Sequence, residues 1–110
     1  MAHAISPEGK REALTLVRNG GAMTSYATTI SIVGTDDLIA RQLIPFGVVH
    51  VFFAADDNDG EVRLGDRREL DVKASWLSDR QLVVTYPEKA RVLRQDATFE
   101  SVVIHYVASK

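Results

Sequence analysis

The run Thr24-Ser25-Tyr26-Ala27-Thr28-Thr29-Ile30-Ser31-Ile32-Val33 decides the fold class of this chain. Tyr26, Thr28, Ile30 and Ile32 would point to one side of an extended chain and the residues between them to the other, which is the two-residue period of a strand. Thr and Ile are branched at Cβ, and this suits a pleated sheet better than a helix. The run therefore predicts a β-strand.

Further alternating or apolar runs lie on both sides of this strand, with polar turns about every ten residues. The expected strands are 13–17, 24–33, 46–55, 69–76, 81–86, 90–94 and 100–107. Residues 78–80 would join two of them as a hairpin, and residues 95–98 would join the last pair. This spacing is typical of a sandwich or a small barrel. The sequence predicts an all-β fold, with six or seven antiparallel strands in a single small sandwich or partly open barrel.

Two segments of the chain differ from the alternating strands. From Val48 to Phe53 the expected strand is apolar on both faces, which is typical of a strand in the middle of a sheet. Residues 36–43 allow two interpretations: one short helix capped by Thr35, or an irregular crossover. Pro45 would end either one.

Length and composition predict one domain, 1–110, in which residues 1–10 form a frayed tail. The chain has a formal net charge of -2. It contains no cysteine, and this excludes disulfides and thiolate metal sites. No apolar run approaches the ~20 residues of a membrane span, and no signal peptide is recognisable at the N-terminus. We therefore expect a soluble domain without a transmembrane segment, cytoplasmic as the sequence stands.

The acidic loop that follows residue 55 is a candidate calcium loop. Placing Gly60 at the invariant glycine puts Asp57 and Asp59 at ligand positions. Ala55 then falls at the first ligand position, and Asp66 falls where a bidentate Glu usually closes the site. A solvated loop without a bound metal is the favoured interpretation.

Sequence signals for catalysis are absent. His3, His50 and His105 do not have the spacing of a metal-ligand motif. The chain has no G-x-S-x-G elbow and no phosphate-binding glycine loop. We therefore predict no catalytic residue, no cofactor and no metal; an enzyme would need a site assembled from scattered residues such as Thr24, His50 and His105.

Basic residues form two clusters, each interleaved with or adjoining acidic residues. A mixed surface of this kind is less favourable to nucleic acid than a basic patch with exposed aromatics, so no nucleic-acid partner is expected. The two clusters are Arg63, Arg67 and Arg68, and Lys89, Arg91 and Arg94.

A row of hydroxyl side chains marks the candidate binding patch, which comprises Thr24, Ser25, Tyr26 and Thr28. It follows a small-residue segment, 20–22, that permits close approach of two backbones. Hydroxyl groups in a row can bond to a ligand's polar edge or across to a neighbouring strand. In the other interpretation, the segment is a hairpin bend followed by the polar face of a strand.

Three motifs resemble those of a family of small, uncharacterised bacterial β proteins. Ser6-Pro7-Glu8-Gly9-Lys10 is similar to an S-P-D-G-K opening, and residues 21–28 to a G-A-T-T-S/G-F-S-T segment. Residues 76–86 are similar to a later W-x-x-x-x-L-x-I-x-Y element. The chain also departs at Asn19-Gly20 and at Met23.

This resemblance, which spans about residues 5–107, implies a β fold and a bacterial origin but no mechanism. Such relatives often follow an N-terminal membrane anchor or lipoprotein signal, which would place the domain in the periplasm or at the cell surface. The favoured function is a non-catalytic binding or interaction module, bacterial and envelope-associated, with another protein as its partner. An inhibitor or immunity-type protein that caps a partner is the alternative, and an enzyme is the third hypothesis. The oligomeric state is not determined by the sequence.

Overall fold

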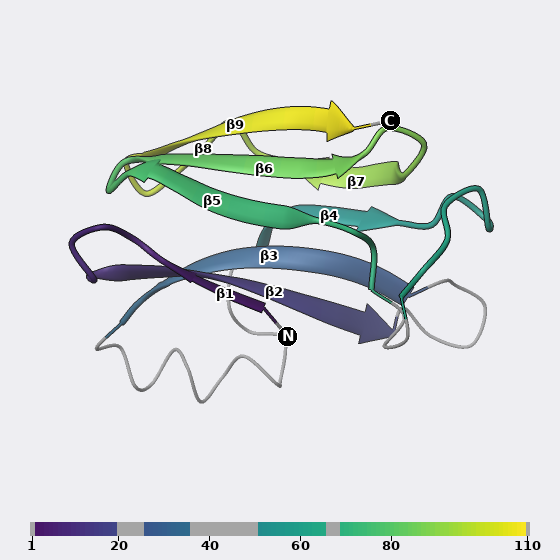
Figure 1. Cartoon of the computed structure of the whole chain (residues 1–110), viewed down its shortest axis with the longest axis horizontal. Helices are drawn as coiled ribbons and strands as arrows, with labels where there is room; N and C mark the ends of the chain where they lie inside the picture. Colours follow the sequence, from purple (N-terminus) through teal and green to yellow (C-terminus); the bar gives the residue numbers. More distant parts are fainter. Residues whose placement is uncertain (1, 20–25, 36–50, 66–68, 110) are drawn as a thin grey trace.

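The computed structural model describes residues 2–19, 26–35, 51–65 and 69–109. These residues form nine strands in two sheets (Figure 1). They contain no helix, and therefore no helix that is long and apolar enough to span a membrane. The strands are β1 Ala2–Ile5, β2 Arg11–Asn19, β3 Tyr26–Gly34, β4 Val51–Asp56, β5 Lys73–Ser78, β6 Gln81–Pro87, β7 Arg91–Gln95, β8 Thr98–Phe99 and β9 Val102–Ser109. The predicted all-β sandwich is confirmed. The helix or crossover expected at 36–43 lies outside the described residues.

The five-stranded sheet has the order β1-β2-β3-β4-β7, and all its strand pairs are antiparallel. β3 comes from the alternating run, and it pairs with β2 along its whole length, from Gly34 opposite Arg11 to Tyr26 opposite Asn19. β4 lies between β3 and β7, as the apolar character of both its faces predicted. Residues 46–50 of that expected strand lie outside the described residues.

The N-terminal segment is not a frayed tail, so that prediction is wrong for residues 2–10. β1 pairs with β2, with Ala2 opposite Thr15 and Ile5 opposite Glu12. The connecting turn is closed by a 2.8 Å hydrogen bond from the Gly9 N–H to the Ser6 carbonyl, and Gly9 has a positive φ of 75° that glycine adopts without strain. Long-range backbone pairing, which composition does not reveal, orders this segment.

The four-stranded sheet has the order β5-β6-β9-β8. β5 and β6 form the predicted hairpin, although the regular strand begins at Lys73 rather than at residue 69. Leu70 and Val72 are nevertheless buried, as the alternation indicated. β8 and β9 are joined by a two-residue turn in which Glu100 and Ser101 have positive φ values of 45° and 71°, as a type I′ turn requires.

The last strands correct the sequence prediction. Residues 90–94 and 100–107 were expected to pair with each other, but β7 pairs with β4 in the five-stranded sheet, whereas β9 pairs with β6 and β8 in the other. The chain thus leaves one sheet after β6, adds β7 to the other sheet, and returns. This crossover makes β9 parallel to β6, the one departure from the expected antiparallel pairing.

The core lies between the two sheets and draws on both. Phe52 and Phe53 of β4 are fully buried; the Phe52 ring lies 6.0 Å from Phe99, and the Phe53 ring 5.7 Å from Tyr86 and 5.8 Å from Tyr106. Each fully buried side chain of this size contributes about 1.5–3 kcal/mol to stability. The other buried members are Ala13, Ile30, Ile32, Ala55, Leu70, Val72, Leu82, Val84, Val102 and Ile104.

The outer face of the five-stranded sheet is buried along β2 and β3. Leu14 and Val33 form a second hydrophobic cluster with Leu16, on the side of β2 and β3 that faces away from the core. Glu12 and Ser31, on the same side, are also buried. Along β2 and β3, therefore, the outer face of the five-stranded sheet is not available as an exposed surface.

Candidate functional site

The patch predicted from the sequence is only partly visible, and one of its members has an internal role. Thr24 and Ser25 lie outside the described residues, and Tyr26 is half-buried at the start of β3. Thr28 is only 1% exposed, and its hydroxyl accepts a 3.0 Å hydrogen bond from the Leu70 N–H. Thr28 therefore holds the segment before β5 against the core and is not available to a ligand.

The structure describes two of the three histidines and only one residue, His105, of the scattered site. His3, on β1, shares a 3.0 Å contact between its Nδ1 and the Glu12 carboxylate. His105 lies exposed on β9, in the other sheet. His50 and Thr24 lie outside the described residues, so the scattered-site hypothesis stays untested.

The acidic loop is tied to β7 through Asp56, which is buried. The Asp56 carboxylate accepts hydrogen bonds from the Arg91 guanidinium, from Nε at 3.0 Å and from Nη2 at 2.7 Å, and from the Asn58 N–H at 2.9 Å. Burial alone would raise the pKa of Asp56, but these hydrogen bonds and the Arg91 charge together hold that pKa below its ordinary value.

The loop beyond Asp56 turns through a run of left-handed residues, with positive φ at Asn58, Asp59 and Gly60. No group of three or more His, Asp or Glu side chains in the described part of the chain is placed to hold a metal ion. Asp66, the expected closing ligand, lies outside that part. The contacts that are seen attach the loop to β7 through an ion pair.

The second basic cluster of the sequence is largely paired with acids. Arg91 also approaches Asp59, at 3.6 Å, and Arg94 forms a 3.2 Å ion pair with Asp96. Arg67 and Arg68 of the first cluster lie outside the described residues. These ion pairs reduce the positive potential along β7.

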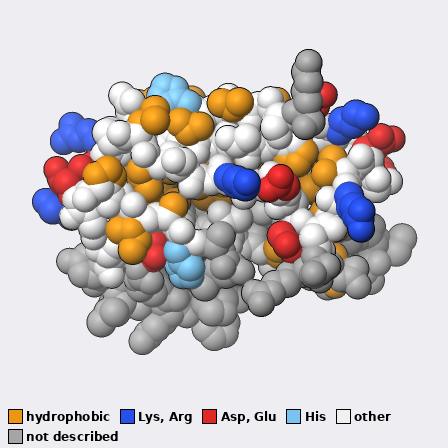
Figure 2. Space-filling model, viewed as in Figure 1, with side chains coloured by type: hydrophobic (Ala, Val, Ile, Leu, Met, Phe, Trp, Pro, Cys, Tyr) orange, Lys and Arg blue, Asp and Glu red, His pale blue; other side chains and the backbone are white. Residues whose placement is uncertain are grey.

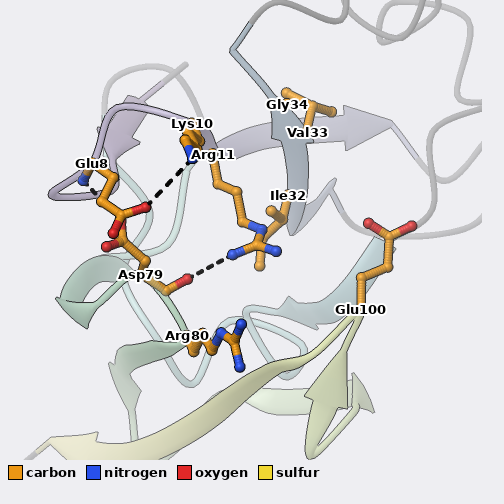
Figure 3. A pocket seen from close by; sticks show the side chains of 9 residues that line it. All are labelled: Glu8, Lys10, Arg11, Ile32, Val33, Gly34, Asp79, Arg80 and Glu100. Carbon is orange, nitrogen blue, oxygen red and sulfur yellow. Dashed lines mark hydrogen bonds and ion pairs between the residues drawn. The ribbon is translucent and has the colours of Figure 1, made fainter.

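A charged pocket of about 410 Å³ opens at one end of the sandwich, between the β1–β2, β5–β6 and β8–β9 turns (Figure 3). Two contacts cross it: the Arg11 guanidinium donates to the Asp79 carbonyl at 2.9 Å, and the Glu8 N–H donates to the Asp79 carboxylate at 2.8 Å. Arg80 and Glu100 also line the pocket. The two hydrogen bonds to Asp79 join the β1–β2 region of one sheet to the β5–β6 turn of the other. The charged side chains around the pocket thus include groups that hold the two sheets together at this end.

The exposed outer face of the four-stranded sheet is of a different character. Residues that share a register row share a face, and three rows across β5, β6 and β9 point away from the core. These three strands contain no Asp or Glu, and Lys73 is their only Lys or Arg, in a chain of which 25% is charged. The rows are Lys73–Thr85–Val107, Ser75–Val83–His105 and Ser78–Gln81–Val103.

Hydrophobic side chains are exposed on this face, which we call the outer face. Val103 is 43% and Val107 50% exposed, and Leu77 projects from the irregularity in β5. Figure 2 shows hydrophobic side chains and a histidine along the upper margin of the molecule, where β9 runs in Figure 1. Apolar side chains gathered on an exposed sheet face are a feature of interaction surfaces.

The outer face ends at an open strand edge on β9. The Val103 N–H bonds to Arg80 and the Ser109 carbonyl accepts from Glu88, both on the β6 side, whereas the Ile104 N–H bonds to Ala97 on the other side. Backbone groups of a strand point alternately to its two neighbours. Even-numbered residues of β9 therefore direct their N–H and C=O groups away from β6.

β8 covers only the beginning of that edge, because it pairs with Val102 and Val103 alone. The N–H and C=O groups of Tyr106 and Ala108 consequently have no hydrogen-bond partner among the described residues. The Tyr106 side chain points into the sandwich, where its hydroxyl donates to the Asp96 carbonyl at 2.6 Å. We call residues 105–109 the open edge of β9.

The open edge lacks the features by which strand edges usually resist pairing. Natural edge strands carry Lys or other charges, Pro or bulges that discourage a further strand. β7 carries Arg91 and Arg94, and β5 carries Lys73, but the open edge contains no Lys, Arg, Asp, Glu or Pro. Sequence alternation could identify β9 as a strand but could not show that one side of it lacks a neighbour.

Comparisons with protein-family models, curated proteins and solved structures found no match to this chain.

Proposed function

We propose that this chain is a non-catalytic protein-interaction domain that binds a partner polypeptide along the open edge of β9 and the adjoining outer face. The observation that carries the proposal is the combination of backbone groups at Tyr106 and Ala108 that have no partner in the described part of the chain with an apolar, acid-free face beside them. A partner segment in extended conformation would add a strand to the sheet at this edge.

The chemistry of the partner follows from the surface. Backbone hydrogen bonds to Tyr106 and Ala108 would supply affinity without regard to sequence, and alternate side chains of the added strand would lie beside Val107 on the outer face. Since β5, β6 and β9 contain no acid, this surface favours small apolar or hydroxyl side chains over a basic segment. The partner is therefore an extended peptide segment with alternating apolar residues.

A non-catalytic function accords with the shape of this surface. Catalysis needs a concave site with an acid or base in hydrogen-bond reach of the substrate. His105 lies on an exposed sheet face whose strands supply no carboxylate. The inhibitor hypothesis has no separate observation in its favour, and the bacterial, envelope-associated setting is a proposal based on the sequence resemblance alone.

The test is a selection of peptides from a random displayed library on the whole chain, immobilised at a low density that keeps copies apart. Selected peptides are then titrated against three variants. Ala108→Pro removes an edge N–H that has no partner within the described segments, and a strand tolerates proline at such a position. Val103→Lys places a charge on the outer face, and Arg80→Ala changes the charged pocket as a control.

We expect peptides with alternating apolar residues, and at least about tenfold weaker binding to Ala108→Pro, because backbone hydrogen bonds at the edge are lost. Val103→Lys should bind more weakly those peptides that extend onto the outer face, and Arg80→Ala should bind all peptides as the parent does. If no such peptide is selected, or if Ala108→Pro binds every selected peptide as well as the parent does, the proposal is wrong.

A further inference from the structure

The open edge of β9 is centred on Val107. Its backbone groups that lack a partner among residues 2–19, 26–35, 51–65 and 69–109 belong to Tyr106 and Ala108, the residues immediately before and after Val107. In an antiparallel pair, residues that face each other with both N–H and C=O groups exchange both hydrogen bonds. An edge of this kind can therefore pair with a second copy of itself around a two-fold axis.

We propose that the polypeptide that binds this edge is a second copy of the same chain, with β9 antiparallel to β9 and the two-fold axis at Val107. This inference rests on the proposed function and names its partner. Tyr106 of each copy would exchange hydrogen bonds with Ala108 of the other, so every unpaired backbone group of the open edge finds a partner. The two four-stranded sheets become one continuous sheet.

The neighbouring strand selects this register. The Ile104 N–H is already bound to the Ala97 carbonyl, so an added strand can extend only as far as the position opposite residue 105. An axis at Val107 places Ser109 of the second copy there, opposite His105, and uses the open edge fully. An axis at Tyr106 would instead place Ala108 opposite Ile104, whose N–H is occupied.

Charge is what favours a second copy over an unlike partner. A two-fold pairing brings every charge on the edge close to its own equivalent, so an edge strand with Lys or Glu would repel itself. The open edge carries neither. The basic groups of the adjacent edge strand β7 are each neutralised, Arg91 by Asp56 and Arg94 by Asp96.

The absence of cysteine from this chain allows a direct test of the register. Because Val107 directs its own backbone groups toward β6, it would face its equivalent in a non-hydrogen-bonded pair, with Cα atoms about 4.5 Å apart. A disulfide needs a separation of roughly 4.4–6.8 Å. Val107→Cys in the whole chain should therefore form a disulfide-linked dimer under mild oxidation.

Val103→Cys is the matched control, because Val103 has the same residue type, strand, face and nearly the same exposure but lies beside β8. We expect the Val107→Cys protein to become mostly dimeric on a non-reducing gel while the Val103→Cys protein stays monomeric. Equal cross-linking of both variants would indicate random collision or face-to-face contact, and cross-linking of neither would indicate no such dimer; either result overturns the inference.

Sedimentation velocity of the cysteine-free chain gives a second measurement. The parent should shift from monomer to dimer as its concentration rises, whereas Ala108→Pro should associate at least about tenfold more weakly, because its lost N–H removes a symmetric pair of hydrogen bonds. A parent that stays monomeric, or an Ala108→Pro dimer as strong as the parent's, contradicts the proposal.

The two proposals can fail separately. The peptide selection uses the edge of single immobilised copies, and the cross-linking uses two copies in solution. Peptide binding that depends on Ala108 without a cross-linked dimer would refute the second copy as partner and leave the proposed function in place. Failure of both experiments would remove both proposals.

Discussion

Replacement of Arg91 by alanine should destabilise the fold at neutral pH and lose most of that effect in acid. Asp56 is only 5% exposed, and its carboxylate accepts hydrogen bonds from Arg91 Nε and Nη2 and from the Asn58 N–H. Without the guanidinium, a buried charge remains, and among the described residues the Asn58 N–H is the donor left to it. The substitution also disconnects β7 from the end of β4.

The magnitude follows from the burial of the two partners. Removing one partner of a fully buried ion pair costs about 3–5 kcal/mol. The Arg91 side chain is 44% exposed, however, so water reaches the gap and solvates part of the charge. We expect a loss of about 2–3 kcal/mol in the free energy of unfolding, or roughly 10–20 °C in the midpoint of thermal unfolding.

The dependence on pH follows from the lowered pKa of Asp56. Because this pKa is lower in the folded state than in the unfolded chain, the pair stabilises the fold above the unfolded pKa of about 4. That stability is lost as the pH falls through the lowered folded pKa. In Arg91→Ala, burial without the guanidinium favours the protonated carboxyl, so acid relieves the variant while it weakens the parent.

The assay is urea unfolding at about pH 7 and about pH 3, followed by circular dichroism and by the fluorescence of Trp76, the single tryptophan. Arg94→Ala is the control, because its ion pair with Asp96 is more exposed and should be worth less than about 1 kcal/mol. Two results would contradict this role of Arg91. One is a loss of unfolding free energy in Arg91→Ala at neutral pH that is no larger than in Arg94→Ala, and the other is a loss in acid that is as large as at neutral pH.

Three further predictions concern stability and use the same urea assay. Thr28→Val should cost about 1–3 kcal/mol, because the buried Leu70 N–H loses its acceptor, whereas Thr28→Ser should retain the bond; equal costs for both would contradict this role. Leu82→Ala should cost about 2–5 kcal/mol through the cavity left between the sheets, and a cost under 1 kcal/mol would place Leu82 outside the core. Ser101→Gly should stabilise the fold by about 0.5–1 kcal/mol, since the positive φ of Ser101 strains any residue with a Cβ; a destabilised variant would contradict the turn geometry.

Features with a local cause could be predicted from the sequence. The alternation of Thr and Ile in β3 indicates a strand because branched Cβ atoms act on their own residue's backbone. The β5–β6 hairpin was predicted because two alternating runs and a short polar turn lie next to one another in the chain. The burial of Leu70 and Val72 followed from the same two-residue period.

The candidate site could not be predicted in the same way. Thr28 was placed in a surface patch because alternation separates the two faces of a strand but does not say which is covered, and both faces of β3 are buried. The open edge of β9 went unrecognised because an edge is defined by a missing neighbour, and strand neighbours in this fold come from distant parts of the chain.

Local patterns in the amino-acid sequence were enough to predict a small all-β domain with strands close to β2, β3, β6 and β9, because period and side-chain shape act over a few residues. Tertiary structure alone decided that β7 joins β4 while β9 runs parallel to β6. That choice depends on which apolar faces can be buried together across the whole chain, and no local pattern encodes it. The same choice leaves β8 too short to cover β9, and so exposes the edge on which the proposed function rests.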